Sequence, residues 1–337
     1  MKRIRVILSL FAIPFSMMSA AQAVLTDCQS NDDFICAMSN PEDLLSIPGS
    51  SYVMISNMEN AGHLYVTNTA DLSSQLSFPG DTAKQVHDKE NFPSCPGPLT
   101  SNFRPHGLAL REGENGVHTL YVVGHGDREA IEVFQLNVNA APKLTWQGCV
   151  IAPEKVSLNS VAPLPNGAFA ATNFNLAGGE VWEWQPTSGW AKVPGSDMLG
   201  PNGLITSKDG EWFYIGAWND EALVRLSRGK QPPEKQMVKV DFHIDNVRWG
   251  MNETILVAGQ KGVRENVGAC LRQGFCDNAS TGVALIDEQT LSVVASKELP
   301  VGDKLKLGTV AIKVNGDIWV GGIGGSTHIG RFTFNQD

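Results

Sequence analysis

The sequence predicts an all-β fold, a six-bladed β-propeller with a central metal site, and three observations support this expectation. An apolar strand, a short turn and a second strand recur six times along the chain of 337 residues. The third, fourth and fifth copies begin at equal intervals of 43 residues, which matches the roughly 40 to 50 residues of a propeller blade. Long apolar stripes of helical period are missing from the sequence, so we expect few helices.

The six copies extend over nearly the whole chain, and one apolar position aligns in all of them. In order, the copies are PEDLLSIPGSSYVMISN from Pro41, PHGLALREGENGVHTLYVVG from Pro105, LNSVAPLPNGAFAATN from Leu158, PNGLITSKDGEWFYIG from Pro201, IDNVRWGMNETILVAG from Ile244 and LGTVAIKVNGDIWVGG from Leu307. The aligned apolar residues are Leu44, Leu108, Val161, Leu204, Val247 and Val310. Runs of β-branched and aromatic residues bounded by turn signals are predicted strands, among them 119–123, 212–215, 254–258 and 317–320.

Two intervals between aligned positions are longer than the others, with 64 residues before the second copy and 63 before the sixth. We interpret the extra residues as loop insertions, of which the first carries Cys95 and the second carries Cys270 and Cys276. We also expect the residues after Leu25 to pair with the last blade, because a propeller otherwise leaves open strand edges.

Residues 1–23 have the three-part form of a secretory signal. Basic residues precede the apolar run 6–18, and Ala21-Gln22-Ala23 follows it as a cleavage motif. The run has 13 residues, fewer than the roughly 20 that a membrane-spanning helix needs. We therefore expect cleavage after Ala23, export to the periplasm or the extracellular space, and a single propeller domain over residues 24–337.

Charge and cysteine content narrow the classes of partner. The formal net charge is −9, and removal of three basic residues with the signal takes it to −12, which argues against nucleic acid and anionic membranes as partners. All six cysteines follow the signal, and an even number in an exported chain indicates disulfides. Proximity in sequence favours Cys28–Cys36 and Cys270–Cys276, which leaves Cys95–Cys149. A thiolate metal site is the weaker alternative, since no CxxC pair occurs.

Polar residues occupy one column of the repeat, two positions before each aligned apolar residue. These residues are Glu42, His106, Asn159, Asn202, Asp245 and, in the sixth copy, Gly308. Radial repetition brings equivalent positions of all blades together at the mouth of the central tunnel. A column rich in oxygen ligands and bases therefore predicts a binding or catalytic site there.

The oxygen ligands of this column suit calcium. Two carboxylates and three amide oxygens are available, from Glu42, Asn159, Asn202, Asp245 and Asn246, and Ca²⁺ takes six to eight oxygen ligands. The remaining positions could accept water and a substrate oxygen. The alternative, that Asn202-Gly203 forms a hairpin turn, is weakened because Asp209-Gly210 is available for that turn.

Two histidines complete the candidate site. His106 belongs to the polar column and His125 follows the second strand of the same repeat, so we expect a general base and its assisting partner. Phe103, Phe174 and Trp218 flank site residues and are candidates for an apolar wall, although core packing is the simpler role for each.

These motifs, in this order, resemble those of the paraoxonases, calcium-dependent lactonase and arylesterase propellers. The matching segments are Glu42-Asp43, Pro105-His106-Gly107, HGDREAIEVF from His125, SLNSV around Asn159, Asn202-Gly203 and IDNV around Asp245. The resemblance implies that Glu42, Asn159, Asn202, Asp245 and Asn246 hold a catalytic calcium. It also implies that His106 activates water, with His125 assisting.

The chain departs from this family at three places. The acid that helps to hold a second, structural calcium is replaced by Ser160, so Asp43 remains as its only candidate ligand here. A family histidine after the fifth blade's strand is replaced near Gln260. No cysteine follows Cys276, so a disulfide between the chain ends is absent and strand pairing must close the ring.

The function expected from this resemblance is hydrolysis of a small lactone or aryl ester by a calcium-dependent, monomeric enzyme. Gluconolactonase-like propellers of the regucalcin type, which hydrolyse sugar lactones with one divalent metal, are the nearest alternative. A non-catalytic propeller that uses calcium for rigidity is the other alternative, because propellers host many functions. The sequence does not identify the natural substrate.

Overall fold

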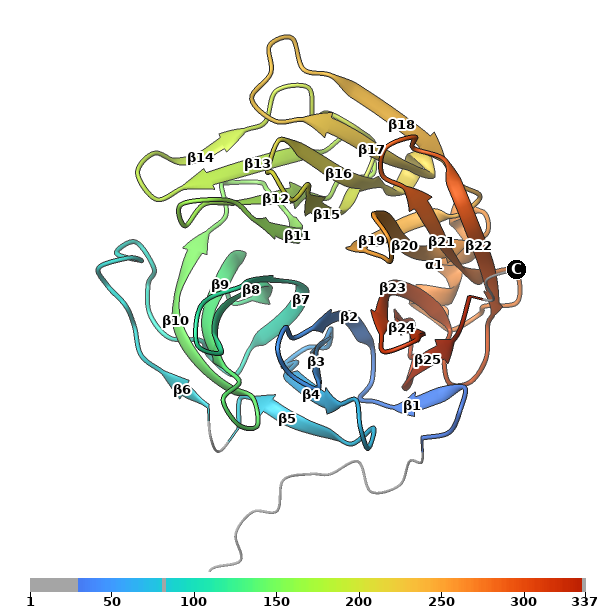
Figure 1. The fold of residues 1–337 in the computed structure, drawn as a ribbon, viewed down its shortest axis with the longest axis horizontal. Coiled ribbons are helices and arrows are strands. Elements are labelled where there is room, and N and C mark those ends of the chain that lie inside the picture. The colour runs from blue at the N-terminus through green and yellow to red at the C-terminus, as the bar shows by residue number, and fades with distance from the viewer. Residues whose placement is uncertain (1–29, 81–82, 335–337) are drawn as a thin grey trace, which may run out of the picture.

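The computed structural model describes residues 30–80 and 83–334, which form six sheets arranged in a ring around a central axis (Figure 1). The fold is a six-bladed β-propeller, as predicted. Blade one contains β2 (Pro41–Ser46), β3 (Tyr52–Asn57), β4 (Leu64–Asn68) and β5 (Ser74–Phe78). Blade two contains β7 (Phe103–Arg111), β8 (Val117–Gly126), β9 (Ala130–Asn137) and β10 (Lys143–Ile151), with β6 (Lys84–Gln85) parallel to β10 at its outer edge.

The next three blades are regular four-stranded sheets. Blade three contains β11 (Leu158–Pro163), β12 (Phe169–Asn173), β13 (Glu180–Gln185) and β14 (Gly189–Lys192). Blade four contains β15 (Pro201–Thr206), β16 (Trp212–Ala217), β17 (Ala222–Ser227) and β18 (Lys235–Lys239). Blade five contains β19 (His243–Trp249), β20 (Thr254–Lys261), β21 (Ser280–Asp287) and β22 (Val293–Pro300).

Both ends of the described chain build blade six. Its strands are β23 (Leu307–Val314), β24 (Asp317–Ile323), β25 (His328–Phe332) and the N-terminal β1 (Phe34–Cys36). β1 pairs antiparallel with β25, with Phe34 opposite Gly330 and Cys36 opposite His328. The predicted closure of the ring by strand pairing is confirmed, because β1 pairs with the outer edge of β25, which would otherwise stay open.

The aligned apolar column lies in the core. All six of its residues are buried on the innermost strands, with at most 1 % exposure, and pack in the layers between neighbouring blades. The four strands that the sequence predicted most clearly all form, within β8, β16, β20 and β24. Burial of this column fixes the register of each innermost strand, because a one-residue slip would turn the apolar side chain toward the tunnel.

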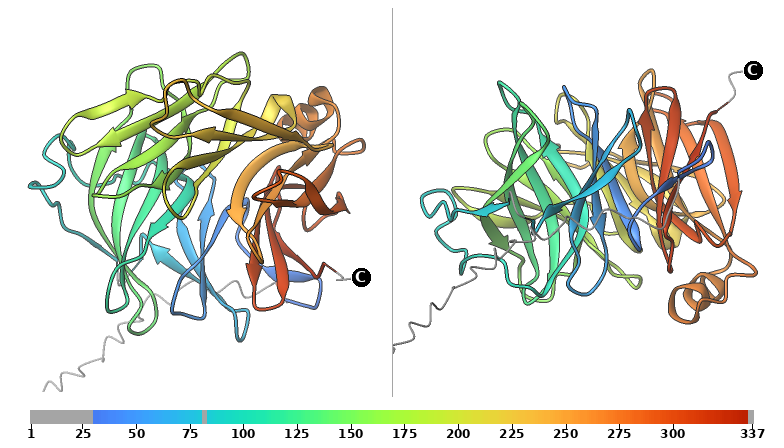
Figure 2. Two further views of the ribbon diagram at one scale, coloured as in Figure 1. Left: turned by 45° about the horizontal axis from the view of Figure 1, so that its top comes forward. Right: turned by 90° about the horizontal axis from the view of Figure 1, so that it is seen from below.

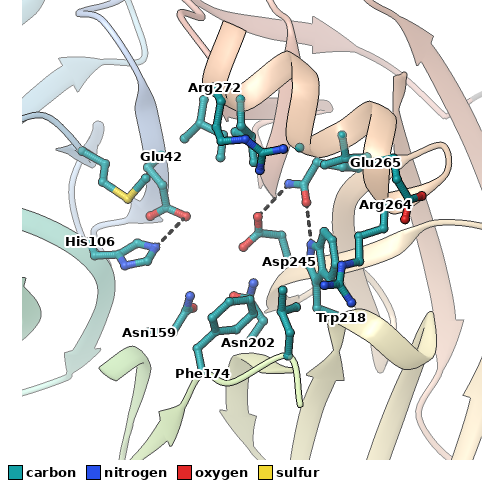
Figure 3. Close-up of a pocket in the computed structure, with 17 residues that line it drawn as sticks. Glu42, His106, Asn159, Phe174, Asn202, Trp218, Asp245, Arg264, Glu265 and Arg272 are labelled. Carbon is teal, nitrogen blue, oxygen red and sulfur yellow. Dashed lines mark hydrogen bonds and ion pairs between the residues drawn. The ribbon is translucent and has the colours of Figure 1, made fainter. Parts of the chain in front are cut away.

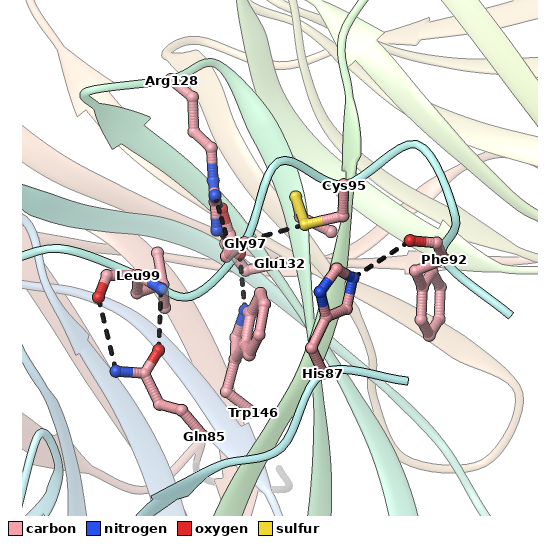
Figure 4. Close-up of a disulfide and its surroundings, with 10 residues drawn as sticks. Gln85, His87, Phe92, Cys95, Gly97, Leu99, Arg128, Glu132 and Trp146 are labelled. Atoms are coloured by element: carbon pink, nitrogen blue, oxygen red, sulfur yellow. Dashed lines mark hydrogen bonds and ion pairs between the residues drawn. A yellow bond between two sulfur atoms is a disulfide. The ribbon is translucent and has the colours of Figure 1, made fainter. Parts of the chain in front are cut away.

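The first insertion crosses the outside of blade two. It contributes β6 and is joined to β10 by the disulfide between Cys95 and Cys149, with an S–S distance of 2.02 Å (Figure 4). Gln85 and Leu99, near the two ends of the insertion, exchange two hydrogen bonds. The insertion is therefore a bound outer layer of blade two.

The second insertion differs from the expected loop, because it forms α1 (Arg264–Gln273). The helix packs Val267 and Cys270 inward, ends at Gly274 in the left-handed conformation, and is linked to the following turn by the predicted disulfide Cys270–Cys276. Gly274 suits this C-cap because glycine has no Cβ penalty there. Figure 2 shows that α1 projects from one face of the ring.

Two predictions fall on residues outside the described ranges. The signal sequence 1–23 and Cys28, the expected partner of Cys36, both lie there. In the described part of the chain, no helix has the length and apolar character needed to cross a membrane. The two disulfides seen between described cysteines fit an oxidising compartment.

Candidate active site at the mouth of the tunnel

A local irregularity in strand pairing positions the polar column. In each blade the pairing of the innermost strand with its neighbour shifts register at the column position, for example between Pro105 and Leu108 in β7 and between Pro201 and Leu204 in β15. The other four innermost strands show the same shift. A bulge of this kind re-aims side chains. It explains how polar column residues turn toward the tunnel while apolar residues two positions later stay in the core.

Glycines after the column residues let the innermost strands approach one another. A Cβ on Gly203 would lie 2.5 Å from the backbone oxygen of Asp245, and one on Gly107 would lie 2.4 Å from that of Asn159. Asn202-Gly203 therefore lies within β15 and forms no hairpin turn. That turn falls at Lys208–Gly210, where Gly210 has a φ of 73°. The sequence interpretation of this motif is confirmed.

The column residues line a cavity of about 440 Å³ at this end of the tunnel (Figure 3). Its polar floor is formed by Glu42, His106, Asn159, Asn202 and Asp245. Asn246 lies beside this floor and donates a hydrogen bond from Nδ2 to Oε1 of Glu42, at 2.8 Å. The structure thus brings together all five predicted calcium ligands and the predicted base from five different blades.

The cavity walls and roof are mostly apolar. Phe174 and Trp218 line them, as the sequence suggested, together with Met58, Leu176, Val267, Leu271 and Ile323. Phe103 instead packs in the core between blades one and two. The helix α1 covers one side of the opening and contributes Arg264, Glu265 and Arg272 to its rim.

Four buried oxygen atoms of this site have no hydrogen-bond partner. They are Oε2 of Glu42, Oδ1 of Asn159, Oδ1 of Asn202 and Oδ1 of Asn246. An unsatisfied buried polar atom costs about 1–3 kcal/mol, so four such atoms in one cluster indicate a missing partner. All four are acceptors. A hard cation fits them, because carboxylate and amide oxygens are the ligands that such ions prefer.

The charges of the site also lack compensation. Burial raises the pKa of Glu42 to about 7, although the hydrogen bond from Asn246 opposes the shift. Burial, followed by the nearby Glu42, raises the pKa of Asp245 to about 8. Two neighbouring carboxyl groups ionise together at neutral pH more readily when a cation lies between them. The electrostatics therefore agree with the unpartnered oxygens.

The two histidines form a chain that leads away from the cavity. Nδ1 of His106 lies 3.0 Å from Nε2 of His125, and Nδ1 of His125 lies 2.7 Å from Oε2 of Glu129. The other ring nitrogen of His106, Nε2, faces Glu42 Oε1 at 3.6 Å. Burial lowers the pKa of His106, which favours a neutral imidazole at the cavity. The predicted contact between the two histidines is present, and Glu129 was not predicted.

Gln260 is a second residue that the sequence did not assign to the site. Its Nε2 donates to Oδ2 of Asp245 at 2.7 Å, and its Oε1 accepts from Nε1 of Trp218 at 2.7 Å. The fully buried amide thus links a polar floor residue to an apolar wall residue. The signals that the sequence offers for it are its place near the end of the second strand of blade five and the family histidine that it replaces there.

Asp43, the possible ligand of a second calcium, has a different partner. Both of its oxygens lie 2.5 Å from Nη2 of Arg248, and Oδ2 accepts from the backbone nitrogen of Leu108 at 2.7 Å. Arg248 also lines a second cavity of about 460 Å³, formed by the opposite ends of the innermost strands. The pair lies between the two ends of the tunnel, and we propose no second ion at Asp43.

Comparison with known proteins supports the propeller fold alone. No protein-family model matches the sequence, and no curated protein matches it. A structural-genomics target named as a candidate gluconolactonase superposes with a TM-score of 0.54 at 16 % identity, over 94 % of this chain and 97 % of that one. A luciferin-regenerating enzyme gives 0.56 at 9 % identity, over 89 % and 93 % of the two chains. A streptogramin B lyase gives 0.53 at 13 % identity, over 90 % and 97 %.

These three structures share the propeller architecture with this chain. Their names belong to more than one reaction class, hydrolase and lyase among them. At such low identity the likeness supports the fold alone, so any function must come from the site.

Proposed function

We propose that this protein is a calcium-dependent hydrolase of lactones or aryl esters. The observation that carries the proposal is the cluster of four unpartnered buried oxygens beside two buried carboxyl groups with raised pKa values and a partly buried histidine. If the cavity bound no ligand, each of these buried polar groups would destabilise the folded protein with no compensating interaction.

The residues present fit a calcium ion. Carboxylate oxygens of Glu42 and Asp245 and amide oxygens of Asn159, Asn202 and Asn246 would hold it, because these are the hard ligands that calcium prefers. When bound, the ion would supply Lewis-acid polarisation of the substrate carbonyl and charge stabilisation of the oxyanion. Five protein residues would leave coordination positions for water and a substrate oxygen.

The protein's own groups supply the rest of the chemistry. His106 would accept a proton from the attacking water at Nε2, the ring nitrogen that faces the cavity. Gln260 and Asn246 hold the carboxylates of Asp245 and Glu42 in place through direct hydrogen bonds. The apolar walls would bind the hydrocarbon part of the substrate and exclude bulk water.

Hydrolysis of a polar sugar lactone is the second candidate function. Its support is the fold shared with the candidate gluconolactonase. The lining favours the first candidate, because seven apolar side chains face this cavity and a sugar would leave its hydroxyl groups unpaired against them.

A substrate panel tests the proposal. The panel contains an aliphatic lactone, an acyl-homoserine lactone, phenyl acetate and gluconolactone, each measured with calcium and with a chelator. We expect calcium-dependent turnover of the lipophilic lactones or of the aryl ester. Preference for gluconolactone would establish the sugar lactonase instead. Absence of turnover throughout, together with a calcium-dependent rise in melting temperature, would replace the enzyme by a binding propeller.

A further inference from the structure

A chain of three side chains connects the candidate base with the turn between β8 and β9 in blade two. It runs from His106 through His125 to Glu129, with contacts of 3.0 Å and 2.7 Å. His106 is the member that lines the cavity. Glu129 is the far member, in the turn between β8 and β9, and its side chain is 32 % exposed.

The acceptor capacity of Glu129 fixes the direction of every hydrogen bond in this chain. An ionised carboxylate only accepts, so Nδ1–H of His125 must donate to it. A neutral imidazole has one donor nitrogen, which leaves Nε2 of His125 as an acceptor. Nδ1–H of His106 then donates to that acceptor, and Nε2 of His106 is left without a proton. This is the nitrogen that faces the cavity, as a general base requires.

We infer that Glu129 is the positioning residue of the site, which sets the tautomers of His125 and His106 and so keeps the cavity-facing nitrogen of His106 available to accept a proton. The inference rests on the proposed hydrolysis for its consequence in catalysis. The tautomers themselves can be measured without any substrate.

Glu129 is held in place by a second contact. Its Oε1 accepts a hydrogen bond from the backbone nitrogen of Leu158 at 2.6 Å, at the start of the innermost strand of blade three. The neighbouring Arg128 pairs with Glu132 and donates no bond to Glu129. The carboxylate therefore has one oxygen for the backbone and the other for His125.

This geometry makes Glu129→Gln a sharp test. The glutamine amide has one acceptor oxygen. We expect this oxygen to keep the hydrogen bond from the backbone N–H of Leu158, because that N–H would otherwise face an N–H₂ group. The N–H₂ group would then face Nδ1 of His125 and reverse each donor and acceptor along the chain. His106 would carry its proton on Nε2, facing the cavity, with the shape of the site unchanged.

The expected result is a fall in kcat of at least about 30-fold with KM within about twofold, because a general base contributes about 10²–10⁴-fold to the rate. The direct readout is the ¹⁵N chemical shift of the ring nitrogens in histidine-labelled protein at mildly alkaline pH, assigned with His106→Gln and His125→Gln. We expect protonated Nδ1 in both rings of the wild type and protonated Nε2 in both rings of Glu129→Gln.

Asp127→Asn is the matched control. It removes the same charge two residues away, from a carboxylate that accepts bonds from Thr100 and Asn102 rather than from a histidine ring. We expect wild-type tautomers and activity within about twofold, so a mere change of local charge is separated from the hydrogen bond to His125.

The outcomes separate this inference from the proposed function. Unchanged tautomers in Glu129→Gln, or a wild type with Nε2 of His106 protonated, would overturn the role of Glu129 whatever the activity. Reversed tautomers with wild-type kcat would show that His106 is not the base. Reversed tautomers in a protein that hydrolyses no member of the panel would leave the positioning role confirmed and remove the proposed hydrolysis.

Discussion

Glu42 and Asp43 are adjacent residues, both buried on the innermost strand of blade one, and they have opposite surroundings. Asp43 faces Arg248, whose Nη2 lies 2.5 Å from both carboxylate oxygens. Glu42 faces the cavity with one oxygen bonded to Asn246 and the other unpartnered. Burial raises the pKa of Asp43 to about 6, even though the charge of Arg248 opposes the shift, and raises that of Glu42 to about 7.

The difference separates a buried carboxylate that has an arginine partner from one that has none in contact within the described part of the chain. On the Asp43 side the chain provides its own cation, and backbone oxygens of Leu44, Val247 and Leu108 accept further bonds from the same guanidinium. On the Glu42 side the described residues gather acceptors and place no lysine or arginine within ion-pair distance. Uncompensated buried charge is a mark of functional sites, and here it lies at the open end of the tunnel.

The largest expected effect comes from removing ligands on the Glu42 side. We expect Asp245→Asn and Asn202→Ala to lower kcat/KM by about 10³-fold or more. The first removes the negative charge of a proposed calcium ligand, and the second removes a ligand oxygen. The stabilisation that calcium gives to the wild type should disappear in both variants, because binding to the folded state is what raises stability. The measurements are turnover of the best panel substrate and melting temperature with and without calcium.

Asn173→Ala serves as the control for asparagine loss, because Asn173 bonds Glu180 and the backbone of Ser157 outside the cavity. It should keep its calcium response. Wild-type turnover in Asp245→Asn would contradict the calcium mechanism, and a calcium response in both ligand variants would move the ion elsewhere.

The next largest effect is expected on the Asp43 side. Arg248→Met should destabilise the protein by about 3–5 kcal/mol, because it leaves a buried carboxylate unpaired. The double variant Asp43→Leu/Arg248→Met should recover most of this loss, since a buried pair replaced by apolar groups is often neutral. Chemical denaturation of the wild type, both single variants and the double variant gives the coupling. If the double variant were no more stable than Arg248→Met, the Asp43–Arg248 pair would contribute more to stability than mutual charge neutralisation.

The repeat revealed the column but not the residues that support it. Glu42, His106, Asn159, Asn202 and Asp245 share one alignment position, so a single periodicity finds them all. Fold and ring closure follow from the same periodicity and from the need to pair open edges.

The supporting residues carry no such period. Arg248 meets a partner 205 positions away in sequence, and Gln260 reaches Asp245 across a hairpin. Glu129 lies in the turn between β8 and β9, and its contact with His125 depends on the conformation of that turn, which no repeat position specifies. The helix α1 was also not foreseen, because Gly268 interrupts its segment and its few buried residues, Val267 and Cys270, are set by packing over the cavity.

The pH dependence of calcium binding should report the uncompensated charge itself. Raised carboxyl pKa values mean that the folded, calcium-free protein binds protons more tightly than the unfolded chain does. Its stability should therefore fall as pH rises from about 5 to about 8. Calcium needs the ionised forms of Glu42 and Asp245, with pKa values of about 7 and about 8, so its affinity should drop about 500-fold from pH 8 to pH 6.

Titration calorimetry across this range, with melting temperatures in chelator, measures both slopes. The two slopes must have opposite signs if the carboxyl groups and the ion share one site. A calcium affinity independent of pH would place the ion away from Glu42 and Asp245. Arg248→Met is unsuitable as a control here because it changes the stability baseline, whereas Asn173→Ala should reproduce the wild-type slopes.

The smallest expected effect concerns the roof of the cavity. The disulfide Cys270–Cys276 closes a short segment, six residues apart in sequence, which holds α1 with Val267 and Leu271 over the opening. Replacing both cysteines by alanine should raise KM for a lipophilic substrate about three- to fivefold. Without the disulfide, the helix would have to become ordered when the substrate binds, and this weakens binding. kcat and calcium affinity should stay near wild type, because the disulfide packs in a cluster of apolar residues that includes Val267, Leu307 and Ile323. A fall in kcat with unchanged KM would instead show that α1 affects the polar residues of the cavity floor, Glu42 among them, rather than the binding of substrate.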